Sequence, residues 1–320
     1  MSVVVLIENW EGAFKKTSYE SLSYAKKIAN DLSKECVALT FKASNPIELV
    51  DYGADKIINI DNLAFESTSN DNIAHIINDI SNQEDSHMII FSNTISSKSI
   101  TPILANNMQA GLITNVIDFP ENYSPLQIKC KAFSSKAYVK YESNYIKNII
   151  SIIPNAIGSE YQESGKGEII NVTYDKSKLN NNIEIINRTK QSEKISLSDA
   201  DIVISAGRGL KGPENWSMIE ELASTIGAAT ACSKPVSDMG WRPHSEHVGQ
   251  TGLAINPDLY IAIGISGAIQ HLAGVNSSKH IVVINTDPDA PFFQAADYGI
   301  IGDAFTVVPK LIEAFKIHNN

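Results

Sequence analysis

The sequence predicts an α/β protein of two domains, each built on a mostly parallel β-sheet. Short apolar segments alternate with amphipathic segments along the chain, which is the pattern of β-α-β units. A length of 320 residues is enough for two domains with separate cores. A polar stretch over residues 158–194 separates two series of alternating segments. We therefore expect domains at residues 1–194 and 195–320.

The first domain is predicted from apolar strands with amphipathic helices between them. The helices are expected at 19–33 and 71–81, where apolar residues recur at helical spacing on one face. The strands are expected at 3–7, 36–41, 56–60, 88–91 and 149–153. The loop after the first strand has one glycine and two acidic residues, so it lacks the glycine pattern that binds dinucleotide phosphates. We expect this domain to provide a scaffold and a subunit interface.

The polar stretch at 158–194 is rich in Asn, Lys, Ser and Glu. It contains an alternating segment at 169–174, which predicts an edge strand followed by an exposed connector.

The second domain is predicted to be another parallel sheet, with ligand-binding loops at the carboxyl ends of its strands. We expect strands at 201–205, 259–263, 280–284 and 305–308. A helix is expected at 214–226, because Pro213 suits the first turn of a helix.

Composition excludes several classes of protein. A hydrophobic share of 43% and a charged share of 19% are typical of soluble globular chains, and no apolar run is long enough to span a bilayer. A net charge of −10 argues against a general nucleic-acid binder. The cysteines, Cys36, Cys130 and Cys232, have no paired spacing that would predict disulfides or a metal site. The first residues lack the pattern of a leader peptide, so we expect a cytoplasmic protein.

Two glycine-containing loops of the second domain are candidate phosphate sites. Residues 264–267 follow a predicted strand and precede a short helix, so that glycines, a helix N-terminus and the Ser266 hydroxyl could face phosphate oxygens. Arg208 lies between Gly207 and Gly209, where a guanidinium is well suited to a diphosphate. The alternative for Arg208 is an ion pair with a nearby acidic residue. The run from Val248 to Gly274, which contains the 264–267 loop, predicts a phosphorylated, planar ligand.

Three long segments carry a resemblance to a known family. They read GRGLKGPENW (207–216), VGQTGLAINPDLYIAIGISGAIQHLAG (248–274) and VVINTDPDAPFFQAADYGIIGD (282–303). In this order they resemble the alpha subunit of electron-transfer flavoproteins. The resemblance is dense over the last third of the chain and weaker over the rest. It implies two Rossmann-like domains, an N-terminal sheet like that of adenine-nucleotide hydrolases and a C-terminal FAD-binding parallel sheet.

The resemblance also implies which residues contact FAD. His271 would lie beside the flavin carbonyl that gains negative charge on one-electron reduction, as a protonated or donating imidazole, and Thr251 would lie near the flavin N5. Lys234 stands where relatives usually have Arg, which keeps the charge and loses the planar fork. Asn285 and Asp303 would contact the adenosine half. The full set is Arg208, Ser233, Lys234, Val248, Gly249, Gln250, Thr251, Ser266, Gly267, Ala268, Ile269, Gln270, His271, Asn285 and Asp303.

Structural alternatives exist for several of these residues, and no metal site is predicted. The 249–252 loop could be a turn whose side chains bond their own backbone, and a helical histidine is often purely structural. His244 and His247 lack a third ligand at suitable spacing, which favours a surface loop over a metal site. Asp287 and Asp289 flank a proline, which favours a turn over a cation site.

The resemblance implies an electron carrier without a substrate site of its own. Such a subunit pairs with a beta subunit that holds AMP, and each dimer binds one FAD. It would accept electrons from flavin dehydrogenases, such as acyl-CoA dehydrogenases, and pass them to a membrane quinone oxidoreductase or another acceptor. Three alternatives remain open: an enzyme that uses a bound dinucleotide directly, a nonredox adenine-nucleotide-binding regulatory subunit, and a flavin-bifurcating member of the same family.

Overall fold

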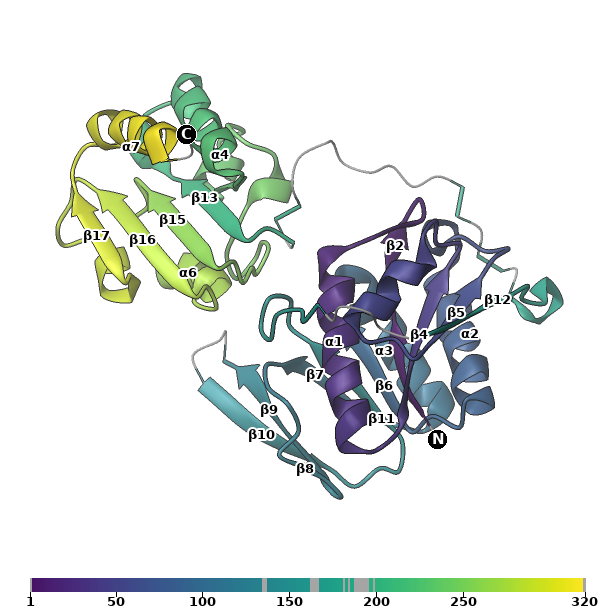
Figure 1. Ribbon diagram of the computed structural model, residues 1–320. Helices are drawn as coiled ribbons and strands as arrows, with labels where there is room; N and C mark the ends of the chain where they lie inside the picture. Colours follow the sequence, from purple (N-terminus) through teal and green to yellow (C-terminus); the bar gives the residue numbers. More distant parts are fainter. Residues whose placement is uncertain are drawn as a thin grey trace. The chain divides into compact units, whose positions relative to one another are not determined.

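The structure is a computed structural model, which describes residues 2–133, 137–161, 167–180, 182–183, 185–186, 196–197 and 199–318. It contains two compact units (Figure 1). One unit, the N-terminal one, holds the described parts of residues 1–131 and 138–190, and the other, the C-terminal one, holds those of 132–137 and 191–320. Each unit is built on its own parallel-rich sheet, so the predicted α/β fold class is confirmed. Among the described residues no helix is long and apolar enough to cross a membrane.

The N-terminal sheet has the strand order β10-β9-β7-β11-β6-β1-β4-β5-β12. Neighbouring strands from β7 through β12 in this order are parallel, and β7 pairs with β9 in antiparallel fashion. The strands are β1 (Ser2–Leu6), β4 (Glu35–Phe41), β5 (Lys56–Ile60), β6 (Met88–Ser92), β7 (Gly111–Val116), β9 (Leu126–Ala132), β10 (Ala137–Ser143), β11 (Asn148–Ile152) and β12 (Glu168–Val172). The short β8 (Asn122–Tyr123) pairs with β9, and β2 (Asn9–Trp10) pairs with β3 (Ala13–Phe14). The predicted edge strand is β12.

Helices cover both faces of this sheet and bury two apolar clusters. α1 (Lys16–Asp31) packs on one face, where it buries Leu22, Ala25 and Ile28. α2 (Asn70–Gln83) and α3 (Ile95–Met108) pack on the other face. Both begin at a hydroxyl cap, because Ser69 accepts from Asn72 N and Thr94 accepts from Ser97 N. Short 3₁₀ helices are Pro46–Tyr52, Phe65–Ser67 and Lys176–Lys178.

A buried carboxylate holds the loop that leaves the N-terminal sheet after β11. Glu20 on α1 is 3% exposed. Its oxygens accept hydrogen bonds from the backbone N–H groups of Asn155 at 2.7 Å, Ile157 at 2.9 Å and Gly158 at 3.0 Å. The three donors compensate for the desolvation of the charge, so the loop is fixed to α1.

The C-terminal sheet has the strand order β14-β13-β15-β16-β17, and all of its pairs are parallel. The strands are β13 (Ile202–Ala206), β14 (Ala229–Cys232), β15 (Leu259–Ile263), β16 (His280–Asn285) and β17 (Tyr298–Ile301). Figure 1 shows α4 (Ser217–Ile226) and α7 (Ala304–His318) on one face and α6 (Ile269–Val275) on the other. The remaining helices are α5 (Lys234–Asp238) and the 3₁₀ helices Arg208–Leu210, Pro213–Trp216, His244–Glu246 and Pro291–Ala295.

Two parts of the fold differ from the sequence-based expectation. The strand predicted at 305–308 is wrong, because this segment lies inside α7, whose buried residues Ala304, Val308 and Ile312 recur every four positions. The true edge strand is β17, just before it. Strands β7, β9 and β10 were not predicted, nor was α3.

We expect Glu20→Gln to destabilise the N-terminal unit by about 1–3 kcal/mol, because an amide offers one acceptor oxygen and no charge to the three N–H groups. Urea unfolding followed by circular dichroism measures the change. Glu35→Gln, at the exposed start of β4, is the matched control and should unfold like the parent. Equal stability of both variants would contradict the role of the Glu20 carboxylate.

Candidate cofactor-binding site

Loops that leave the carboxyl ends of the C-terminal strands are tied to one another by their backbones. Each loop continues the hydrogen-bond pattern of the sheet one step past the strand. The bonds are Ser233 N to Ala206 O at 3.1 Å, Gly207 N to Ile263 O at 2.9 Å, Gly264 N to Ile284 O at 2.9 Å and Gly302 N to Asn285 O at 2.9 Å. The loops therefore form one connected edge, where open parallel sheets bind their ligands.

The loops after β13 and β15 touch through glycine backbone. Gly209 N donates to Gly264 O at 3.1 Å. A Cβ atom on Gly209 would lie 2.6 Å from the Cα of Gly264, and one on Gly264 would lie 2.8 Å from the Cα of Gly209. Gly264 also has φ +60°, which disfavours other residues. Arg208 lies between the close-packed glycines with an exposed side chain, so its guanidinium is available to a ligand.

The 248–252 loop is fixed to α6 and to β14. Val248 N donates to Cys232 O at 3.1 Å, and Gln250 N donates to Gln270 O at 2.7 Å. A Cβ atom on Gly274 would lie 2.6 Å from the Cα of Gly249, so the helix and the loop meet backbone to backbone. The side chains of Gln250 and Thr251 are exposed at this edge.

A third close approach fixes the loop before α6. Gly267 has φ +87°, and a Cβ atom on it would lie 2.5 Å from Phe292 N. Phe292 N in turn donates to Ser266 O at 3.1 Å. The segment after β16 therefore fixes the backbone of this loop, while the Ser266 side chain stays exposed.

The structure brings all of the predicted site residues to this one edge. Those with exposed side chains come from four of the loops. They are Arg208, Lys234, Gln250, Thr251, Ser266, Ala268, Ile269, Gln270 and Asp303. Ser233, Val248, Gly249, Gly267 and His271 are buried beneath them, and Asn285 is half-buried.

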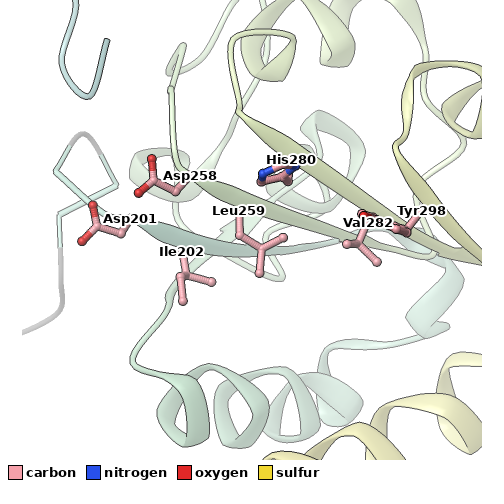
Figure 2. A pocket seen from close by; sticks show the side chains of 7 residues that line it. All are labelled: Asp201, Ile202, Asp258, Leu259, His280, Val282 and Tyr298. Atoms are coloured by element: carbon pink, nitrogen blue, oxygen red, sulfur yellow. The ribbon is translucent and has the colours of Figure 1, made fainter. Parts of the chain in front are cut away.

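A cavity of about 510 Å³ lies at the opposite edge of the same sheet (Figure 2). Its lining comes from the amino ends of β13, β15 and β16 and from Tyr298 on β17. Asp201, Asp258 and His280 contribute its polar side chains. Because none of the predicted site residues lines it, this cavity is separate from the edge that the loops form.

Comparison with known proteins identifies the family. The model of the electron transfer flavoprotein domain matches residues 3–177, and that of the electron transfer flavoprotein FAD-binding domain matches residues 196–276. Over 317 residues the chain is 35% identical to the electron transfer flavoprotein subunit alpha of Bacillus subtilis (strain 168), covering 98% of this chain and 97% of that one. This chain belongs to the electron transfer flavoprotein alpha-subunit family.

Two further relatives show where the similarity is strongest. The mitochondrial electron transfer flavoprotein subunit alpha of Dictyostelium discoideum is 54% identical over 127 residues, which cover 40% of this chain and 36% of that protein. Protein FixB of Clostridium saccharobutylicum is 29% identical over 321 residues, covering 98% of this chain and 96% of its own. Similarity to the subunit alpha of Bacillus subtilis thus extends over 98% of this chain, whereas the higher identity is confined to a shorter segment.

The geometry fits the FAD that the family implies. The glycine contacts leave no room for side chains where backbone must come close, and exposed polar groups from separate loops converge on one edge. Beneath them the Nδ1 atom of His271 is buried without a hydrogen-bond partner among the described residues, and the side chain is only 7% exposed. Buried polar atoms of this kind are uncommon outside functional sites.

Asn285 and Asp303 lie beyond the residues matched by the FAD-binding model, and both side chains already support the fold. Asn285 Nδ2 donates to Ile265 O at 3.0 Å, and its Oδ1 accepts from Asp287 N at 3.1 Å. Asp303 Oδ1 accepts from Phe305 N at 3.0 Å, which caps the first turn of α7. Their predicted contact with adenosine therefore competes with these structural roles.

His271 is held as a neutral side chain. Its Nε2 lies 2.8 Å from the Tyr260 hydroxyl. Burial and, to a smaller extent, the neighbouring His247 lower the pKa of His271 to about 4, while the Val248 backbone opposes the shift. Of the two expected forms of this imidazole, the structure favours the neutral donor over the protonated ring.

The segment 241–247 was expected to be a surface loop, but its last residues are buried. His247 is 6% exposed, and burial lowers its pKa. Arg242 fixes the segment, because it donates to both oxygens of Glu246, at 2.7 and 2.6 Å, and to Glu220 at 3.1 Å. The spacing of four residues between Arg242 and Glu246 was the sequence feature that could have predicted this ion pair. Within the described ranges, no group of three or more His, Cys, Asp or Glu residues could hold a metal ion.

We expect Gly274→Ala to destabilise the C-terminal unit by about 1–3 kcal/mol, because the new Cβ would overlap the backbone of Gly249. Helix propensity alone predicts the opposite, a gain of about 0.5–1 kcal/mol for alanine inside α6. A lower urea midpoint for the variant would show that the overlap with Gly249 dominates, and a higher midpoint would show that helix propensity dominates. A variant as stable as the parent, or more stable, would show that the loop and the helix do not meet as described.

We also expect an acid-dependent loss of stability that depends on His271. Its pKa is about 4 in the folded chain, whereas an unfolded histidine titrates near 6.5, so the unfolded chain binds the proton more readily. The contribution of the neutral ring is complete above about pH 6.5 and is lost as the pH falls toward 4, with about 2 kcal/mol lost by pH 5.

Urea unfolding of the parent and of His271→Asn at pH 7 and pH 5 measures this loss. The parent should lose about 2 kcal/mol more than the variant between the two values. His280→Asn, which replaces an exposed histidine at the start of β16, is the control and should follow the parent. Parallel losses in the parent and His271→Asn would contradict a depressed pKa at His271.

Proposed function

We propose that this chain is the alpha subunit of a heterodimeric electron carrier that binds one FAD at the carboxyl edge of its C-terminal sheet. The observation that supports this proposal is the convergence of glycine-backed loops within the region matched by the FAD-binding family model. When bound, FAD supplies the redox chemistry, and the chain supplies binding and electrostatics. The proposed contacts are Arg208, Ser233, Lys234, Val248, Gly249, Gln250, Thr251, Ser266, Gly267, Ala268, Ile269, Gln270, His271, Asn285 and Asp303.

Each group of residues has a proposed task that follows from its chemistry. The exposed guanidinium of Arg208 can form paired hydrogen bonds with a diphosphate, and Ser266 adds a hydroxyl. Lys234 begins α5 with an exposed side chain and brings positive charge to the same edge without a planar fork. Thr251 and His271 can offer hydrogen-bond donors to the isoalloxazine ring. Asn285 and Asp303 are proposed for the adenosine half in addition to their structural bonds.

The partner proposed for this subunit is an electron transfer flavoprotein beta subunit, which would hold AMP. We propose flavin dehydrogenases, such as acyl-CoA dehydrogenases, as donors and a membrane quinone oxidoreductase as acceptor, with the cytoplasm as the location. A flavin-bifurcating role within the same family is the second candidate. In both cases the chain is a carrier, and a nonredox nucleotide-binding subunit is the alternative that experiment must exclude.

We expect the chain, purified together with its beta subunit, to be yellow and to contain one FAD per dimer. Absorption spectra and stepwise anaerobic reduction test this directly. A colourless complex that takes up no added FAD would overturn the flavoprotein proposal in favour of the nonredox one.

We expect Arg208→Ala to weaken FAD binding by roughly 10- to 100-fold, since a charge-assisted hydrogen bond contributes about 1.5–3 kcal/mol. Lys310→Ala, which removes an exposed charge from α7, is the matched control and should bind FAD like the parent. Fluorescence titration of the FAD-free complex gives both affinities. An unchanged affinity for Arg208→Ala would remove the role assigned to that guanidinium.

A further inference from the structure

A fully buried tyrosine lies directly beneath the predicted flavin site. Tyr260 is the second residue of β15, near the middle of the sheet, and it is 0% exposed. Its hydroxyl lies 2.8 Å from Nε2 of His271, which follows eleven residues later in the chain, on α6. Neither family resemblance nor the glycine loops assign a role to this hydroxyl. A buried hydroxyl needs a hydrogen-bond partner, and here the partner is a predicted cofactor residue.

Aromatic packing leaves the tyrosine and the histidine little freedom to separate. The Tyr260 and Phe292 rings are stacked, with centroids 6.3 Å apart and an interplanar angle of 20°. The His271 ring meets Phe292 edge-on at 5.8 Å. Phe292 is itself 0% exposed and is fixed by the close approach of Gly267. The imidazole is therefore locked in orientation by a phenol on one side and a phenyl ring on another.

The two nitrogens of His271 differ in their surroundings. Nε2 lies 2.8 Å from the Tyr260 hydroxyl, whereas Nδ1 is buried and has no hydrogen-bond partner among the described residues. Burial keeps the pKa of Tyr260 far above its ordinary value, although the Ser205 hydroxyl partly opposes this, so the phenol retains its proton and can donate it to Nε2. When the phenol donates to Nε2, the neutral ring carries its own proton on Nδ1.

We propose that Tyr260 is a positioning residue that holds His271 in the neutral tautomer with the proton on Nδ1. The N–H group at Nδ1 then stays available to a ligand, because Nδ1 has no partner among the described residues. The titratable groups that face the ring are Tyr260 from β15 and His247 from the segment 241–247, and His247 has Lys234, Asp238 and His244 around it. The expected effect on the midpoint potential of bound FAD rests on the proposed function, whereas the tautomer of His271 does not.

The test is nitrogen NMR of the full-length chain labelled with ¹⁵N-histidine and assembled with unlabelled beta subunit, with and without FAD. We expect a protonated Nδ1 and an unprotonated Nε2 for His271 between pH 6 and pH 8, assigned by the signal lost in His271→Asn. In Tyr260→Phe the tautomer ratio should shift by roughly fivefold toward Nε2–H, because one hydrogen bond of about 1 kcal/mol is removed. The midpoint potential of bound FAD should become more negative.

Tyr298→Phe is the matched control, because it removes a hydroxyl that is exposed on β17, and it should leave the tautomer and the potential unchanged. A protonated Nε2 in the parent, or an unchanged tautomer in Tyr260→Phe, would overturn the proposal. If Tyr260→Phe does not fold, the tautomer of the parent decides alone. Failure of the complex to bind FAD would overturn the proposed function only, since the tautomer is also measured without FAD.

Discussion

Close contact between backbones at the carboxyl edge of the C-terminal sheet is the constraint on which the site depends. Gly209 lies against Gly264, Gly249 against Gly274, and Gly267 against Phe292, each with no space for a Cβ atom. Side chains at these positions would push the loops apart and break the hydrogen bonds that join one loop to the next. The glycines therefore act before any ligand contact, because they fix the loops that present Arg208 and the exposed polar side chains.

Local pattern predicted those elements whose burial is fixed by their own residues. Residues 259–263 form a continuous apolar segment, and residues 56–60 contain three isoleucines, and both are strands over the same residues in the structure. Residues 305–308 are equally apolar and β-branched, yet they lie in α7, because the pairing position beside β16 is taken by β17. Which segment pairs with a given strand depends on the other segments of the sheet, so it cannot be predicted from one segment alone. The antiparallel pairing of β9 with β7 was missed for the same reason.

The location of the site could be predicted from the sequence, whereas the hydrogen bonds that its side chains make within the chain could not. Loops after parallel strands meet at one edge, so Arg208 and the 264–267 loop could be placed together from the predicted strands. Asp303 was assigned only through the resemblance, because β17, the strand that it follows, was not predicted. The structural bonds of Asn285 and Asp303 depend on distances to Ile265 and Phe305 that no spacing reveals. Nor could the sequence show that the ring of His271 is deeply buried and bonded to Tyr260.

In the proposed function, the neutral state of His271 would reconcile stability with the task of an electron carrier. A buried imidazolium would interact strongly with developing negative charge, but its desolvation would weaken the fold in every redox state. A neutral N–H donor that is fixed in orientation costs the fold less, and its hydrogen bond strengthens when the acceptor becomes anionic. Tyr260 contributes by occupying the other nitrogen, so that the donor is present without reorganisation. The interaction is then largest only in the reduced state, which is where a carrier can use it to set its potential.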